Sequence, residues 1–227
     1  MASSPSVRTL LDHNIDEIRN DVLRMGSLVG EQVARAVRAL KERNVSLAHQ
    51  IIESDQQINA LRYRVESECV RTIATQQPAA KDLRYILAAI HMAGELERIG
   101  DHASSIASIA IRIGDEPLIK PLIDVPRMQE IACGMIHEAL DAFIEMDAEA
   151  AKRVAARDQE VDDLYVQILR ELLTFMMQDS KTIAQAVYLL WVAHSLERIA
   201  DRATNLCERV IFAATAELGD YKPPRTP

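Results

Sequence analysis

Two stretches of the chain each carry a glutamate and an aspartate four positions apart. Residues 96–103 read Leu-Glu-Arg-Ile-Gly-Asp-His-Ala, and residues 196–203 read Leu-Glu-Arg-Ile-Ala-Asp-Arg-Ala. On a helix this spacing places the two carboxylates above one another on one face, where like charges cost about 0.2–0.5 kcal/mol. A bound cation would offset that repulsion. The candidate metal ligands of the two motifs are Glu97, Asp101, Glu197 and Asp201.

Each motif is preceded by a second acidic segment, Asp-Gln-Gln-Ile-Asn at 55–59 and Asp-Gln-Glu-Val-Asp at 158–162. Asp55 falls within an apolar stripe, where a carboxylate is costly unless it is paired or binds a cation. Side chains from two adjacent helices would then form an all-oxygen site, which suits Mg²⁺, Mn²⁺ or iron better than Zn²⁺. These segments, with the amide one turn after the second motif, add the candidate ligands Asp55, Asn59, Asp158, Asp162 and Asn205.

The two sites are not expected to be equal. Where the second has Asp162, the first has the neutral Asn59. Salt bridges within the helix are the competing interpretation, because Arg98 and Arg198 precede the two aspartates by three residues. In that case the glutamates would be solvated. A single motif would favour the salt bridges, whereas its repetition beside matching acidic segments favours metal binding.

The chain shows little sign of catalysis. None of its six histidines follows a glutamate by three residues, the spacing that di-iron helical bundles use. His194 is expected to be a packed or capping residue, and His102 is replaced by Arg202 in the second motif, which argues against an obligatory metal role. Phosphate-binding loops and nucleophile elbows are absent from the sequence. We therefore predict that the chain is not an enzyme.

Two alternatives remain open. A carboxylate-ligated metalloenzyme, such as an oxidase or a phosphatase, would need an open coordination position and a general acid or base. A purely helical interaction module would leave the acidic pairs solvated.

Apolar residues recur at steps of three and four along most of the chain, as in amphipathic helices. Asn44 can cap a helix, and Gln76-Gln77-Pro78 should end one, because proline disfavours a helical residue before it. Gly114 and the prolines that follow it favour a boundary between two halves. The expected helices cover roughly residues 11–40, 47–69, 79–113, 128–146, 147–172 and 180–218.

The helices and the repeated motifs together predict an all-α fold of two tandem, pseudo-symmetric three-helix bundles with six long antiparallel helices. We expect the first repeat to span residues 1–117 and the second residues 118–227, with Tyr221–Pro227 as a disordered tail.

The net charge, the cysteines and the apolar segments indicate which partners and which cellular compartment to expect. A net charge of −8 and a pI of about 5.3 argue against nucleic-acid binding, which relies on basic faces. The three widely spaced cysteines are expected to be buried and reduced. Residues 1–6 do not resemble a signal peptide, and the apolar run 186–193 is far shorter than the roughly 20 residues of a membrane span. We expect a cytoplasmic protein without a membrane span.

The quoted motifs, together with Leu23-Arg-Met-Gly-Ser27, Pro78-Ala-Ala-Lys-Asp-Leu-Arg84 and Asn205-Leu-Cys-Glu-Arg-Val210, resemble the PhoU family over nearly the whole chain. The resemblance implies two three-helix bundles with metal clusters near the Glu-x-x-x-Asp motifs. It also implies an accessory regulator of the high-affinity phosphate transporter that represses the phosphate-starvation response. The implied partners are the transporter ATPase subunit and a membrane sensor histidine kinase, and the implied oligomeric state is a homodimer.

Overall fold

The computed structural model describes residues 7–217, in which all regular secondary structure is helical. The all-α prediction is therefore confirmed. The expectations for Met1–Ser6 and for the tail Tyr221–Pro227 lie outside the described residues. The elements are α1 (Val7–Glu42), α2 (Val45–Gln76), α3 (Ala80–Ile113), α4 (Asp124–Glu145), α5 (Ala148–Ala155), α6 (Asp158–Gln178), a 3-10 turn (Ser180–Thr182) and α7 (Ile183–Thr215).

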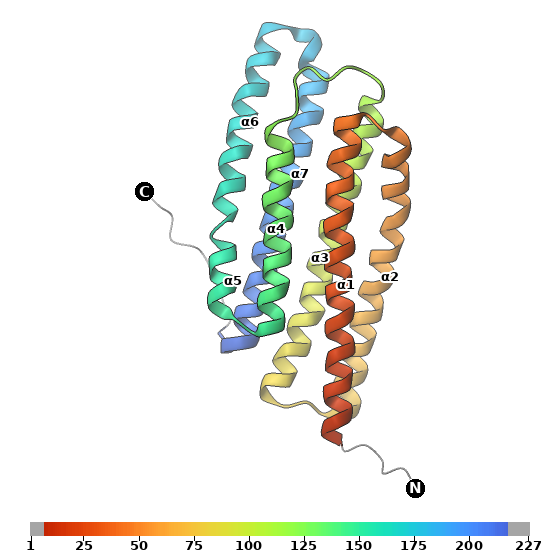
Figure 1. Ribbon diagram of the computed structural model, residues 1–227, viewed down its shortest axis with the longest axis vertical. Coiled ribbons are helices and arrows are strands. Elements are labelled where there is room, and N and C mark those ends of the chain that lie inside the picture. The colour runs from red at the N-terminus through yellow and green to blue at the C-terminus, as the bar shows by residue number, and fades with distance from the viewer. Residues whose placement is uncertain (1–6, 218–227) are drawn as a thin grey trace.

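The helices form two bundles side by side, α1–α3 in one and α4–α7 in the other (Figure 1). Helices α3 and α7 pack against each other at the centre, α1 and α4 cover one side of them, and α2 and α6 lie at the two outer edges. The boundary at residues 117 and 118 stays a prediction, and it falls in the connection between α3 and α4.

One expected helix is interrupted. The segment 147–172 was expected to be one helix. In the structure it is divided, because α5 ends at Ala155 and α6 begins at Asp158. Arg157, in the break, forms an ion pair with Glu138 of α4 at 2.5 Å and with Glu160 at 3.4 Å. The break therefore leaves Asp158 in the first turn of α6.

The predicted helix ends are confirmed by their local contacts. The Asn44 side chain accepts a hydrogen bond from the Leu47 amide at 2.9 Å, and thereby caps α2. Gln77 takes a left-handed conformation, with φ of 49°, directly before Pro78. Asp147 caps α5 in the same way as Asn44, by accepting from the Ala150 amide at 2.9 Å.

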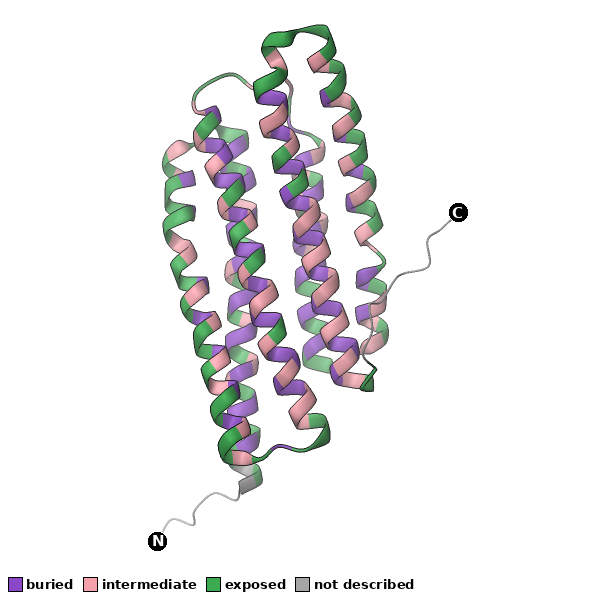
Figure 2. Cartoon of the chain, turned by 180° about the vertical axis from the view of Figure 1, so that it is seen from behind, coloured by how far each residue is buried: buried purple, intermediate pink, exposed green. Residues whose placement is uncertain are grey.

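The core follows the predicted apolar stripes, and Figure 2 shows buried faces alternating with exposed ones along each helix. Cys69, Cys133 and Cys207 are all free and buried, as expected. Burial raises the pKa of Cys69 and of Cys207 to about 12, so these thiols stay protonated at neutral pH.

A close approach of α1 to α4 depends on Gly26, because a Cβ placed there would lie 2.0 Å from the Leu140 side chain. We predict that Gly26→Ala destabilises the protein by about 1–2 kcal/mol, since overpacking outweighs the gain in helix propensity. The control is Gly94→Ala, where a Cβ would meet nothing within 4 Å. That variant should gain about 0.5–1 kcal/mol. Urea denaturation of both measures the difference, and equal stabilities would refute the packing argument.

Candidate metal sites

The second acidic cluster lies between α6 and α7. Asp158 and Asp162 come from α6, and Glu197 and Asp201 come from α7. The pKa of Asp158 is raised to about 7, first by burial and then by the charges of the other three. Its Oδ1 is buried and has no hydrogen-bond partner within the described part of the chain. The fold therefore gathers four carboxylates and leaves one of their oxygens unpaired.

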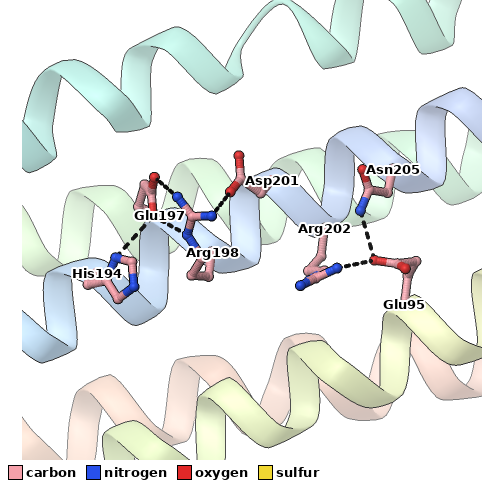
Figure 3. A network of polar contacts seen from close by, with 7 residues as sticks. All are labelled: Glu95, His194, Glu197, Arg198, Asp201, Arg202 and Asn205. Carbon is pink, nitrogen blue, oxygen red and sulfur yellow. Dashed lines mark hydrogen bonds and ion pairs between the residues drawn. The ribbon is translucent and has the colours of Figure 1, made fainter. Parts of the chain in front are cut away.

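A guanidinium from the motif itself partly neutralises this cluster. Arg198 Nε donates to Glu197 Oε2 at 2.6 Å and Nη1 pairs with Asp201 Oδ2 at 2.9 Å, while Nη2 donates to Glu197 Oε1 (Figure 3). The salt-bridge interpretation is thus right for Asp201. It is wrong in leaving the glutamate solvated, because the same guanidinium binds Glu197.

The prediction of a packed or capping role for His194 is wrong. Its side chain is 53% exposed, and Nδ1 lies 3.3 Å from Glu197 Oε2. The ring of Tyr165 lies 6.2 Å from the imidazole, centroid to centroid. The imidazole therefore lies at the rim of the second cluster, outside the core.

The first acidic cluster lies between α2 and α3. Asp55 and Asn59 come from α2, and Glu97 and Asp101 from α3. Asn59 Nδ2 donates to Asp55 Oδ2 at 3.0 Å. The pKa of Asp101 is raised, first by burial and then by the negative charges of Glu97 and Asp55. The structure thus brings all four predicted side chains of this site into one neighbourhood.

The cation of the first cluster comes from a position that the sequence analysis missed. Arg62 of α2 donates from Nη1 to Glu97 Oε1 at 3.1 Å and from Nε to Glu66 at 2.9 Å. Arg98, expected to pair with Asp101, instead forms an ion pair with Glu95 at 3.1 Å. The position of Arg62, two turns after Asp55 on the same helix face, is the signal that could have identified it.

Gln32 of α1 is a second residue that the sequence analysis missed. It is 3% exposed, and its Nε2 donates to the Ile51 carbonyl at 3.2 Å and to Asp55 Oδ1 at 3.4 Å. Its Oε1 is unpaired among the described residues and lies 3.2 Å from where a Cβ on Gly100 would be. A glutamine inside the apolar stripe of α1 is the sequence signal that could have identified Gln32 as a buried polar neighbour of the first cluster.

Asn205 lies apart from the other candidates of the second cluster, in a contact between the bundles. Its Nδ2 donates to Glu95 Oε2 at 3.0 Å, and Arg202 Nη1 donates to the same oxygen at 3.2 Å (Figure 3). The side-chain amide of Asn205 therefore forms a hydrogen bond between α7 and α3. Its assignment as a metal ligand stays a prediction.

Within residues 7–217, no three His, Cys, Asp or Glu side chains stand close enough to hold a metal ion as they are. The donor chemistry of both clusters nevertheless fits a hard cation, because the donors are carboxylate and amide oxygens. The unpaired oxygens of Asp158 and Gln32 point to the same fit. In each cluster an arginine binds carboxylate oxygens that a metal ion would need.

Comparison with known proteins decides the family. The model of the PhoU domain matches twice, over residues 22–110 and 125–210. The chain belongs to the PhoU family. A relative from Pseudomonas putida, named a phosphate-specific transport system accessory protein PhoU homolog, is 42% identical over 87% of this chain and 78% of its own. The accessory protein PhoU of Escherichia coli is 36% identical over 87% of this chain and 82% of its own.

Crystal structures of PhoU proteins share the fold of this PhoU-family chain. PhoU from Pseudomonas aeruginosa superimposes with a TM-score of 0.86 at 40% identity, covering 91% of this chain and 99% of its own. The phosphate transport system regulatory protein PhoU from Streptococcus pneumoniae also gives 0.86, at 29% identity, covering 93% of this chain and 100% of its own. These relatives are named as accessory or regulatory proteins, which confirms the prediction that the chain is not an enzyme.

A membrane-spanning helix is not found in the described part of the chain, since none of its helices combines the required length and apolar character.

The raised pKa of Asp158 predicts a pH dependence of stability in EDTA. The native carboxyl keeps a proton that the unfolded chain releases near its ordinary pKa of 3.8, so stability falls as the pH rises from 4 towards 7. Solvent screening leaves an effect of about 1–2 kcal/mol. Asp158→Asn should flatten this slope, measured by urea denaturation across that range. Asp163→Asn, at an exposed position of the same helix, should retain it. An unchanged slope in Asp158→Asn would refute the assignment.

Proposed function

We propose that this chain is a cytoplasmic accessory protein of the phosphate-specific transport system. In this role it contacts the transporter ATPase subunit to control phosphate uptake, and a membrane sensor histidine kinase to repress the phosphate-starvation response. The observation that carries the proposal is the PhoU domain match in both repeats, over residues 22–110 and 125–210. The names of relatives that are 36–42% identical support the transport role.

Metal binding is the second part of the proposal. The second cluster would hold one or more Mg²⁺, Mn²⁺ or iron ions on Asp158, Asp162, Glu197 and Asp201, with Asn205 as a further candidate. The first would use Asp55, Asn59, Glu97 and Asp101. A bound ion would neutralise carboxylates whose charges raise one another's pKa values, and would join α2 to α3 and α6 to α7. The unpaired Asp158 oxygen supports this use of the second cluster.

A homodimer completes the proposal. It rests on the family resemblance, and the exposed apolar side chains of α6 support it. Leu173 is 47% and Met177 is 88% exposed, one turn apart on that helix. Apolar patches that continue over several exposed side chains mark protein–protein interaction sites.

Co-purification tests the adaptor function. A tagged chain isolated from phosphate-replete cells should recover both the transporter ATPase subunit and the sensor kinase, and less of them after phosphate starvation. The control is the same tagged chain isolated from cells that lack the transporter, where kinase recovery alone should remain. Failure to recover either protein from phosphate-replete cells would contradict the adaptor function.

Metal analysis tests the cation sites. Protein purified without chelator should contain metal, and Asp162→Asn should lose metal from the second cluster, because it reduces that site to the lower charge of the first. Asp163→Asn, an exposed carboxylate next to it in sequence, is the matched control and should keep its metal. Elemental analysis of each protein gives the stoichiometry. Metal-free wild-type protein would instead support the helical interaction module, and full metal content in Asp162→Asn would exclude that ligand.

A further inference from the structure

The two acidic clusters each contain an arginine, yet the two arginines come from different places. In the second cluster it is Arg198, from within the motif on α7. In the first it is Arg62, from the neighbouring helix α2. The first-motif equivalent of Arg198 is Arg98, whose side chain is 55% exposed and points to Glu95. The repeated motif therefore folds into two different electrostatic arrangements.

A single difference between the motifs accounts for the two positions of the motif arginine. Glu95 stands where the second repeat has Ser195, and it draws Arg98 away from the first cluster with an ion pair of 3.1 Å. Ser195 cannot do this, because its hydroxyl is neutral and donates to the Trp191 carbonyl of its own helix at 2.9 Å. Arg198 therefore binds the carboxylates beside it, those of Glu197 and Asp201.

A second difference between the repeats leaves the second cluster without an arginine from its neighbouring helix α6. Two turns after Asp55 the first repeat has Arg62, whereas two turns after Asp158 the second has Tyr165. The Tyr165 ring lies beside the imidazole of His194, 6.2 Å away. The second cluster therefore relies on Arg198 for a charge that the first cluster obtains from α2.

Arg198 uses all three of its guanidinium nitrogens on this cluster. Nε and Nη2 bind both oxygens of Glu197, and Nη1 binds Asp201 Oδ2 at 2.9 Å. These are the oxygens that a divalent cation would need. Its side chain is also 40% exposed, so it can move from the carboxylates into water without crossing the core.

We infer that Arg198 is a built-in competitor of the cation at the second site. The guanidinium fills the site until the cation concentration is high enough to displace it, and so sets the concentration at which this site loads. The first site is less blocked, since Arg62 binds only one carboxylate of that cluster, Glu97, and shares its charge with Glu66. The inference rests on the proposed metal binding and adds to it a threshold that differs between the two sites.

The test compares Arg198→Gln with Arg98→Gln, the equivalent position of the first motif, whose arginine pairs with Glu95. Each full-length protein is stripped with EDTA, dialysed and titrated with Mn²⁺. Trp191, the only tryptophan, lies two turns before Arg198 on α7 and reports on the second site through its fluorescence. Arg198→Gln should bind Mn²⁺ there about tenfold more tightly, because a positive charge beside a divalent ion is removed. Arg98→Gln should match the wild type.

Thermal unfolding separates competition from a merely structural role of Arg198. In EDTA, Arg198→Gln should melt below the wild type, because the carboxylates have lost their partner. With saturating Mn²⁺ it should melt at or above the wild type. An arginine with only a structural role would lower both melting temperatures equally, which would overturn the inference. Arg198→Lys, which keeps the charge without the planar fork, should bind Mn²⁺ with intermediate affinity.

The outcomes also separate the inference from the proposed function. Equal Mn²⁺ affinity in the wild type and Arg198→Gln, with metal bound in both, overturns the competitor role and leaves the metal site standing. No Mn²⁺ uptake by either protein, while circular dichroism shows that both are helical, overturns the inference together with the proposed metal site.

Discussion

Helices α3 and α7 lie side by side at the centre of the molecule, and the positions of both acidic clusters follow from that packing (Figure 1). Each helix buries a face of isoleucine and alanine, including Ile99 and Ala103 on α3 and Ile199 and Ala203 on α7, all 0% exposed. With those residues fixed inside, the glutamate and aspartate of each motif must lie on the side of α2 or α6. The apolar packing thus aims the carboxylates away from the centre.

The same packing makes it costly in free energy for the carboxylates of the clusters to be ionised. Carboxylates held between two helices are partly removed from water, and each one raises the cost of ionising the next. The protein lowers this cost with arginines. A guanidinium and a metal ion both bind carboxylate oxygens, so a cation bound as proposed would have to displace the groups that stabilise the fold without it. Stability would therefore be coupled to the proposed metal binding at these sites.

The polar contact between the bundles shows how a duplicated fold can become asymmetric. Glu95 binds Arg98 within α3 and both Arg202 and Asn205 across the contact with α7. The equivalent position in the second repeat is Ser195, whose hydroxyl donates to the Trp191 carbonyl of its own helix. One acidic residue in one repeat therefore links the two bundles and also changes the charge inside its own cluster. Two distinguishable acidic clusters follow in part from that one difference.

The sequence by itself determined most of the helices, the cap at Asn44 and the stop at Pro78, because periodicity, capping and proline effects act over a few residues. It did not indicate the break between α5 and α6. Its repeated motif also indicated which carboxylates gather between adjacent helices. The tertiary structure alone decided the partners that come from other helices, such as Arg62 and Gln32 in the first cluster and Glu95 for Asn205. Spacing along one helix can mark such a residue as a candidate, but the residue it contacts depends on how the long helices align across the bundle.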